Sequence, residues 1–436
     1  MKHEPYSTRR SALLEQIGDG VAIIPTAPER VRNRDSHHPY RFDSYFWYLS
    51  GFPEPEAIIV LLGGNDSQPV SRSIIFCRER NEEREVWDGF RYGPEAVCDA
   101  FGFDEAYAFA EFEHRLPDLI ASRSRLWYAF GHEAAVDTDV ISALNTVRAQ
   151  SRAGKRAPGE IRDLREPLDR MRLIKDAHET DIMRRAAAIA AAGHARAMRT
   201  CRPGMAEYEL EAELGYEFRK RGADGHAYSP IVAGGHNACI LHYIENNRLL
   251  SEHALVLIDA GCELEGYASD ITRTFPVSGR FSGVTRDAYE IVLAAQTAAI
   301  AAIKPGAPFI AYHDAALRVL VQGMIDLQLL AGSVDGIIES ETYKPFYMHR
   351  TGHWLGLDVH DAGEYKSGDD WVVLQAGMAL TVEPGLYIRP GATVPEHLHG
   401  IGIRIEDDVF VTTDGCEVYT SAPKSIAEIE EVMRRD

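Results

Sequence analysis

Acidic side chains follow short apolar runs in the carboxyl-terminal half of the chain. Asp259 ends the run ALVLI, and Asp270 lies on the segment that returns after a turn. If Leu264 and Glu265 are the turn residues, Asp259 and Asp270 lie directly opposite each other across a hairpin, roughly 5 Å apart. Two carboxylates at that separation repel each other unless a cation lies between them. Taken alone, the pair leaves open that one carboxyl is protonated or belongs to the turn.

Three histidines fall within the twelve residues of one segment, HRTGHWLGLDVH: His349, His353 and His360. Gly352 and Gly356 favour irregular backbone or strand over helix. The segment is not the H-E-x-x-H helix of zinc proteases, because Arg350 follows the first histidine and no glutamate lies between the first two. A single histidine is usually a hydrogen-bonded structural residue, whereas three so close together indicate a shared site.

Two further carboxylates follow strand-like runs. Glu383 ends the run MALTV and precedes a Pro-Gly turn, and Glu406 closes the alternating run GIGIRI. Alternation puts Arg404 and Glu406 on one face, so we expect Arg404 to keep the Glu406 carboxylate ionised and aimed. An exposed ion pair is the alternative. For Asp407 and Asp408 we expect exposed charges at a turn or on the surface.

These side chains form a candidate metal-ligand set of four carboxylates and one imidazole: Asp259, Asp270, Glu383, Glu406 and His353. Four carboxylates around one ion would carry excess negative charge, whereas two divalent ions balance them. Oxygen-rich sites without sulfur favour a hard or borderline cation such as Mn²⁺ over a structural zinc. Two ions about 3.5–4 Å apart hold a bridging water and lower its pKa, which serves hydrolysis.

Length and composition restrict the setting of this site. A chain of 436 residues predicts two domains. The formal net charge of -20 argues against nucleic acid and anionic membranes as partners. Six cysteines without a C-x-x-C pair, an amino terminus without an apolar signal segment and the lack of a long apolar run favour a cytoplasmic protein.

Two kinds of pattern divide the chain. Residues 1–170 indicate an α/β domain, with buried strands at 57–62 and 73–77 and a linker or domain edge at 150–160. Residues 171–436 indicate an α+β domain with a largely antiparallel sheet. Its expected helices are 171–201 with a break near Asp176, 206–221, 285–303 and 309–330. Its expected strands are 231–233, 255–260, 271–277, 379–383, 386–388 and 401–411.

The ordered ligand set resembles that of the pita-bread metallopeptidases, family M24. The segments that carry the resemblance are IDAGCELEGYASDITRTFPVSGRF, HRTGHWLGLDVHD, LTVEPGLYI and GIGIRIEDDV. Within that group the chain is most similar to the aminopeptidase P family, whose first domain the segment RNRDSHHPYRFDSYFWYLSGFPEPEA also resembles. The resemblance implies a mixed-sheet amino-terminal domain like that of creatinase and prolidase. It implies a curved antiparallel pita-bread sheet in the second domain.

The resemblance also implies a role for each site residue. Asp259 would bind one metal ion, His353 and Glu383 the other, and Asp270 and Glu406 would bridge the two. Glu383 would also shuttle a proton from the bridging water. The other catalytic positions follow the same pattern: His242 beside the tetrahedral intermediate, His360 at the bound peptide, and His349 and Arg404 behind the ligands. Two Mn²⁺ ions are the implied cofactors, with Co²⁺ or Zn²⁺ as substitutes.

The implied activity is removal of the amino-terminal residue from peptides with proline in second position. A bond to proline nitrogen is a tertiary amide without an N–H, which disfavours general aminopeptidases. The alternative is a prolidase, which uses the same ligands but takes only dipeptides. A more remote alternative is a non-catalytic pita-bread binding protein, which the complete ligand set disfavours.

Two positions depart from the family pattern. Arg350 stands where a small residue is common, and we expect it to narrow the substrate pocket. Trp87 matches an aromatic residue that neighbouring subunits of tetrameric relatives lay over the active site, but Asp88 follows it where an apolar residue is expected. Ordinary packing in the first domain is the other interpretation of Trp87. A homo-oligomer, dimer or tetramer, is therefore a prediction, with the first domain shaping the cleft and supporting assembly.

Overall fold

The computed structural model describes residues 3–65 and 69–434. It divides into two compact units, Met1–Met171 and Arg172–Asp436. The sequence patterns predict a division after residue 170, and the roles of the first unit in shaping the cleft and in assembly stay predictions. In the described part of the chain, no helix is both long and apolar enough to span a membrane.

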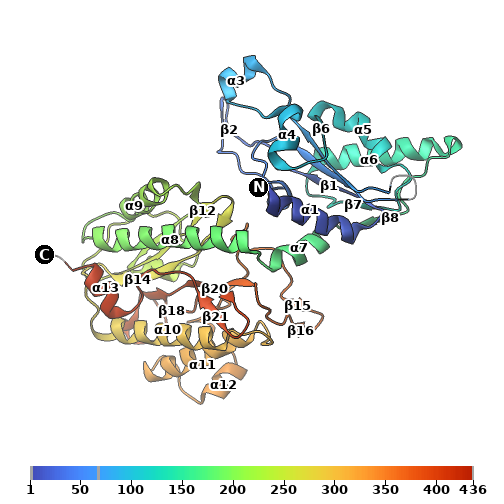
Figure 1. Ribbon diagram of the computed structural model, residues 1–436. Helices are drawn as coiled ribbons and strands as arrows, with labels where there is room; N and C mark the ends of the chain where they lie inside the picture. The colour runs from blue at the N-terminus through green and yellow to red at the C-terminus, as the bar shows by residue number, and fades with distance from the viewer. Residues whose placement is uncertain (1–2, 66–68, 435–436) are drawn as a thin grey trace. The chain divides into compact units, whose positions relative to one another are not determined.

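The first unit is built on a mixed six-stranded sheet (Figure 1). β1 and β5 are antiparallel to β4. On one side β6 is parallel to β5, and on the other side β7 is parallel to β1 and β8 is parallel to β7. The strands predicted at 57–62 and 73–77 are confirmed. The six strands of this sheet, in spatial order, are β6 (Glu105–Ala108), β5 (Arg72–Cys77), β4 (Ile58–Leu62), β1 (Val21–Pro25), β7 (Arg125–Trp127) and β8 (Glu160–Arg162).

Helices complete the core of this unit. Apolar side chains of α5 and α6 pack against β1, β4 and β5 in one buried cluster, because aliphatic residues fill these central strands. The segment 150–160 leads from α6 to the edge strand β8, so it lies within this unit. The remaining elements are α1 (Glu4–Ile17), the β2–β3 hairpin (Val31–Asn33, Ser36–His37), α2 (Ser44–Ser50), α3 (Glu82–Asp88), α4 (Gly93–Phe101), α5 (Phe112–Ile120) and α6 (Ala134–Ala149).

Helix α7 (Arg165–Leu173) ends just before the predicted break near Asp176. The Asp176 carboxylate accepts hydrogen bonds from the backbone N–H groups of His178 and Glu179, and Glu179 accepts from the Asp176 N–H. This capping box starts α8 as a new helix and so confirms the break. The helices of the second unit are α8 (Ala177–Thr200), α9 (Glu207–Lys220), α10 (Gly283–Ala302), α11 (Ala311–Asp326), α12 (Val334–Glu339) and α13 (Ile426–Val432).

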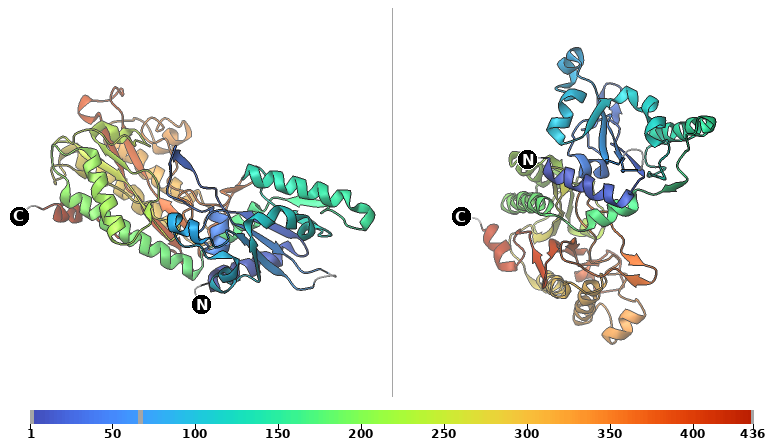
Figure 2. Two further views of the ribbon diagram at one scale, coloured as in Figure 1. Left: turned by 90° about the horizontal axis from the view of Figure 1, so that it is seen from above. Right: turned by 45° about the vertical axis from the view of Figure 1, so that its right-hand side comes forward.

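All strand pairs of the second unit are antiparallel, as the sequence predicted. α8 packs on α9 and on β12 and β13, while α10 packs on α11 and on β17 to β19 (Figures 1 and 2). The strands are β9 (Gly225–His226), β10 (Ile231–Gly234), β11 (Leu255–Asp259), β12 (Cys262–Leu264), β13 (Tyr267–Ala268), β14 (Thr272–Pro276), β15 (Lys366–Ser367), β16 (Asp370–Trp371), β17 (Ala379–Val382), β18 (Gly385–Ile388), β19 (Ile401–Arg404), β20 (Asp407–Val411) and β21 (Cys416–Val418).

The predicted register of the first hairpin is wrong. Asp259 pairs with Thr272, not with Asp270, and the turn residues are Glu265 and Gly266. Both turn residues have positive φ, 50° and 82°, the conformation of a tight hairpin turn that glycine favours. A turn at Leu264 and Glu265, as predicted, would require the leucine to adopt a positive φ, which is strained for a bulky side chain. Asp259 and Asp270 are therefore diagonal neighbours on one face of the hairpin.

The segment 401–411 forms two strands instead of one. β19 ends at Arg404 and pairs with β18, whereas β20 begins at Asp407 and pairs with β17. At the break, the Glu406 N–H donates to the Thr272 carbonyl at 3.0 Å, and the Thr274 hydroxyl donates to the Arg404 carbonyl at 3.0 Å. These contacts bring β14 alongside 404–406, so carboxylates from distant parts of the chain meet.

Candidate metal centre and substrate cavity

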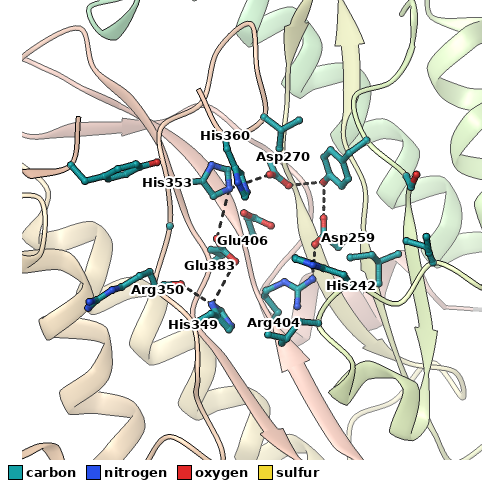
Figure 3. A pocket seen from close by; sticks show the side chains of 18 of the residues that line it. His242, Asp259, Asp270, His349, Arg350, His353, His360, Glu383, Arg404 and Glu406 are labelled. Carbon is teal, nitrogen blue, oxygen red and sulfur yellow. Dashed lines mark hydrogen bonds and ion pairs between the residues drawn. The ribbon is translucent and has the colours of Figure 1, made fainter. Parts of the chain in front are cut away.

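A cavity of about 760 Å³ in the second unit contains every site residue that the sequence predicted (Figure 3). Elements from both halves of the unit contribute, since Asp259 and Asp270 belong to the β11–β14 hairpin and Glu406 follows β19. The predicted residues that line it are His242, Asp259, Asp270, His349, His353, His360, Glu383, Arg404 and Glu406. Arg350 also lines the cavity.

Three of the predicted ligands converge most closely. Ligand atoms of Asp270, His353 and Glu406 lie within 4.8 Å of one another. His353 Nε2 is 3.5 Å from Asp270 Oδ2 and 3.8 Å from Glu383 Oε1. His353 Nδ1 lies 2.9 Å from the Trp354 carbonyl, an acceptor, so Nδ1 carries the proton. That tautomer leaves the Nε2 lone pair free to coordinate a cation.

Tyr228 holds the first carboxylate pair together, and the sequence analysis missed it. Its hydroxyl lies 2.6 Å from Asp259 Oδ1 and 2.5 Å from Asp270 Oδ1. One hydroxyl proton can serve only one of these oxygens at a time, so the phenol alone does not neutralise the pair. No local pattern in the segment HAYSP singles this tyrosine out.

Arg404 pairs with a different carboxylate from the one expected. Its Nη2 donates to Asp259 Oδ2 at 2.5 Å, and its Nε donates to the Thr272 hydroxyl at 3.2 Å. Thr272 in turn donates to Glu406 Oε2 at 2.6 Å, so Arg404 reaches Glu406 only through this hydroxyl. The break after β19 is the reason, because strict alternation between Arg404 and Glu406 ends there. Thr272 follows Asp270 by two residues, so strand alternation could have identified it.

The carboxylates of the cavity are poorly solvated and close together. Burial, and next the neighbouring Asp259 charge, raise the pKa of Asp270 to about 8. The pKa values of Glu383 and Glu406 are raised well above the ordinary value, first by burial and then by each carboxylate's acidic neighbours. Bound divalent cations would remove this cost, since they stabilise the ionised forms. The donor set and its protonation therefore fit a metal centre.

Behind the carboxylates, His349 is held as a neutral ring. Its Nδ1 lies 2.7 Å from the Arg350 carbonyl and therefore carries the proton, while Nε2 accepts from the Tyr387 hydroxyl at 2.9 Å. Arg404 Nη1 donates to the same hydroxyl at 3.1 Å. Burial, and next the Arg404 charge, lower the pKa of His349 to about 3. Tyr387, which the sequence analysis also missed, thus links Arg404 to His349.

Histidine, aromatic and aliphatic side chains make up most of the remaining cavity wall. The His360 ring lies 4.1 Å from that of His353, and His242 enters from the loop after Cys239. Phe309 packs on Tyr365 at 4.9 Å and stacks on Trp371 at 6.2 Å between ring centroids. The three histidines of 349–360 lie outside helices, as their flanking glycines predicted. This wall offers an apolar surface beside the metal ligands.

Asp407 and Asp408 were expected at the surface, and both are fully buried. Asp407 makes ion pairs with Arg273 at 2.6 Å and Lys424 at 2.5 Å. Asp408 Oδ2 accepts from the backbone N–H of the predicted ligand Asp270 at 3.1 Å. The prediction failed because Arg273 and Asp270, both more than a hundred residues away in sequence, supply the partners that allow this burial.

Two family models together match most of the chain. The model of metallopeptidase family M24 matches residues 181–413, and the model of the aminopeptidase P amino-terminal domain matches residues 6–128. The Xaa-Pro aminopeptidase of Escherichia coli strain K12 is 45% identical over 435 residues, covering 99% of this chain and 98% of the relative. Human Xaa-Pro aminopeptidase 3 is 34% identical, covering 98% of this chain and 85% of the relative.

Solved structures agree with these matches. The structure of Pseudomonas aeruginosa aminopeptidase PepP superposes with a TM-score of 0.96 at 50% identity, covering 99% of this chain and 98% of that one. A zinc-substituted Escherichia coli aminopeptidase P in complex with product superposes with a TM-score of 0.97 at 44% identity, with 100% of each chain covered. The expected fold, an α/β domain followed by an antiparallel pita-bread domain, is confirmed by these superpositions.

Proposed function

This chain belongs to metallopeptidase family M24, and we propose that it hydrolyses the bond between the first residue of a peptide and a proline in second position. The observation that carries the proposal is the convergence of Asp270, His353 and Glu406, whose ligand atoms lie within 4.8 Å. Relatives of more than 40% identity that carry the name Xaa-Pro aminopeptidase support the choice of substrate.

Two divalent ions, which we propose to be manganese, would be held by the five predicted ligands. Asp259 would bind one ion, His353 and Glu383 the other, and Asp270 and Glu406 would bridge them. When bound, such ions lower the pKa of a shared water and so supply a nucleophile near neutral pH. Four carboxylates balance the charge of two divalent ions, which supports the proposed number. The relative that was solved in a zinc-substituted form supports exchange between divalent metals.

The chain's own groups would orient the peptide and move the proton. The Glu383 carboxylate takes a proton from the attacking water and returns it to the proline nitrogen, which leaves as a secondary amine. Glu383 lines the cavity beside His353, whose Nε2 lies 3.8 Å from Glu383 Oε1, so its carboxylate stands where it can exchange that proton. His242 faces the oxygen that becomes negative, and His360 contacts the peptide. Arg404 and the neutral His349 keep the ligands oriented through Asp259 and Tyr387.

Selection for proline would follow from the apolar wall. A proline nitrogen has no hydrogen to donate, so a site that binds this residue needs ring contacts instead of an acceptor for that N–H. Phe309, Tyr365 and Trp371 supply such contacts beside the metal ligands. A prolidase would use the same ligands and differs only in accepting nothing longer than a dipeptide.

The test compares three peptides with the same first residue: Xaa-Pro, Xaa-Pro-Xaa and Xaa-Ala-Xaa. We expect manganese-loaded protein to cleave Xaa-Pro-Xaa much faster than Xaa-Ala-Xaa, and a chelator to abolish turnover until Mn²⁺ is restored. Metal analysis by mass spectrometry on the same samples should give two ions per chain. Cleavage of Xaa-Pro alone, with the tripeptide intact, would identify a prolidase, and turnover unaffected by chelation would contradict the proposal.

A cytoplasmic location and assembly into a dimer or tetramer are also proposed. The net negative charge and the scattered cysteines support the location. Trp87 on α3, whose side chain is 81% exposed together with the neighbouring Val86, supports assembly through the first unit. The following Asp88 forms a 3.4 Å ion pair with Arg91, so this departure from the family pattern is accommodated locally.

A further inference from the structure

Two cations lie against one aromatic ring at the cavity. The Arg350 guanidinium carbon lies 5.5 Å, and the Lys366 Nζ 4.5 Å, from the centre of the Trp371 ring. Lys366 is the direct cross-strand partner of Trp371 in the short β15–β16 hairpin. Arg350 and Trp371 both line the cavity, and the Arg350 guanidinium points away from the metal ligands in Figure 3. Arg350 therefore extends over the cavity wall instead of into the ligand cluster.

Within the described ranges, neither Arg350 nor Lys366 forms an ion pair within 4.0 Å of a carboxylate, although Asp369 and Asp370 are close to Lys366 in sequence. Burial raises the pKa of Asp314 and the Arg350 charge acts in the opposite direction, so Asp314 is the acidic group that Arg350 influences from a longer distance. Both side chains are exposed. Contact with an aromatic face orients a cation without cancelling its charge. In a chain with 66 acidic and 46 basic residues, these two cations on either side of a cavity-lining ring offer a binding place for an anion.

We propose that Arg350 and Lys366 bind a carboxylate of the peptide substrate and so make this chain prefer acidic substrates. The inference rests on the proposed peptidase function and adds the chemical class of its preferred peptides. A guanidinium binds a carboxylate through two parallel hydrogen bonds, which suits Arg350 to this role. The Arg350 carbonyl also accepts a hydrogen bond from His349 Nδ1, so the backbone at Arg350 is held next to a cavity-lining histidine.

The carboxylate can come from an acidic side chain or from a free carboxyl terminus. Four substrate pairs distinguish these sources. An acidic side chain is tested by Glu against Gln in the first position, by Glu against Gln in the third position, and by the same third-position pair with an amidated carboxyl terminus. The free carboxyl terminus is tested by Xaa-Pro-Ala against its amidated form. We expect at least one pair to show about a tenfold higher kcat/KM for the charged member, a typical effect of one charge-assisted contact.

The variants are Arg350→Gln and Lys366→Gln, which keep side-chain length and remove charge. We expect Arg350→Gln to lower kcat/KM for the charged member of a pair far more than for its neutral partner, so that most of the tenfold preference is lost, and Lys366→Gln to lose part of it. The matched control is Lys220→Gln, because Lys220 lies 5.5 Å from the Tyr216 ring on α9 and outside the cavity lining. Metal content and Tm of each variant show whether the fold is retained.

The outcomes separate this inference from the proposed function. Cleavage of neutral Xaa-Pro peptides without any charge preference, or equal losses on charged and neutral peptides in Arg350→Gln, would overturn the inference alone. If the wild type cleaves none of the peptides, the peptidase proposal fails. Isothermal titration calorimetry then measures the affinities for Pro-Glu, Pro-Gln and the uncleaved acidic peptides. Tighter binding of the acidic ligands that is lost in Arg350→Gln supports the inference, whereas equal affinities for acidic and neutral ligands overturn it.

Discussion

At the scale of single residues, the cavity holds several negatively charged carboxylates close enough to repel one another. Asp259 and Asp270 share one tyrosine hydroxyl, and Glu406 receives one threonine hydroxyl. Burial, and next the neighbouring carboxylates, raise the pKa values of Asp270 and Glu406, and these neutral donors offset the increase only in part. Cations bound at the proposed metal centre would meet carboxylates that these donors already orient.

Replacing Glu406 by alanine tests this arrangement, because it removes a proposed bridge between two metal ions. We expect kcat/KM to fall by about 10³-fold or more, since a metal-activated water contributes several kcal/mol. The fold should be kept, with Tm and circular dichroism close to wild type. Glu417→Ala is the control, because Glu417 makes a half-exposed ion pair with Arg184 outside the cavity lining. Retained activity with about two manganese ions per chain would contradict the assignment.

At the scale of elements, one buried carboxylate organises the loop that carries His242. Glu207, the first residue of α9, is fully buried. Its Oε1 accepts from the Gly234 N–H at 2.8 Å and from Asn237 Nδ2 at 2.9 Å. Its Oε2 accepts from the Tyr243 hydroxyl and the Arg248 N–H, at 2.8 and 2.9 Å. These four bonds join α9 to both ends of the loop and to the residue next to His242.

Glu207→Gln should therefore disturb the loop. An amide replaces one acceptor oxygen by a donor, which leaves buried donors unsatisfied and should lower the free energy of unfolding by about 1–3 kcal/mol. We expect kcat to fall about tenfold through displaced His242, while metal content stays at the wild-type level. Glu213→Gln is the matched control on the same helix, because Glu213 pairs with Arg196 on α8 and not with the loop that carries His242. Unchanged kcat in a destabilised Glu207→Gln protein would show that the loop does not depend on this anchor.

At the scale of the whole molecule, we expect the proposed metal centre to couple the stability of the fold to pH. The pKa of Asp270 rises from 3.8 to about 8 on folding without metal. Between these values the folded, metal-free protein holds a proton that the unfolded chain has lost. Its free energy of unfolding therefore falls as pH rises, by about 1.4 kcal/mol per pH unit for each such group. Bound cations replace that proton and remove the penalty.

Added Mn²⁺ should consequently raise Tm more at pH 8 than at pH 6. Differential scanning fluorimetry of chelated and manganese-loaded protein at pH 6, 7 and 8 measures this difference. The metal-free protein alone should become less stable over the same range. Glu406→Ala serves as the comparison, since loss of a ligand should reduce the effect of the metal at every pH. A stabilisation by Mn²⁺ that shrinks as pH rises would refute the coupling.

The sequence by itself determined the kinds of ligand, their order and the elements that carry them. Asp259 and Glu383 end short apolar strands, and the Asp176 cap and the two-domain pattern are equally local. Such features follow from periodicity and turn chemistry over a few residues, so they are readable without a structure. For that reason the long helices α8 to α11 and the strands β10, β11, β14, β17 and β18 were predicted, whereas the shorter helices and hairpin strands of the second unit were not. The five candidate ligands line one cavity.

Tertiary structure decided how these groups face one another. The true turn at Glu265–Gly266 moves Asp270 to a diagonal position, and the strand break after Arg404 turns its guanidinium to Asp259. Tyr228 and the burial of Asp407 are likewise outside any local pattern. All of these features depend on pairings between segments far apart in the chain. In such pairings, a shift of the register by one residue changes which side chains lie opposite each other.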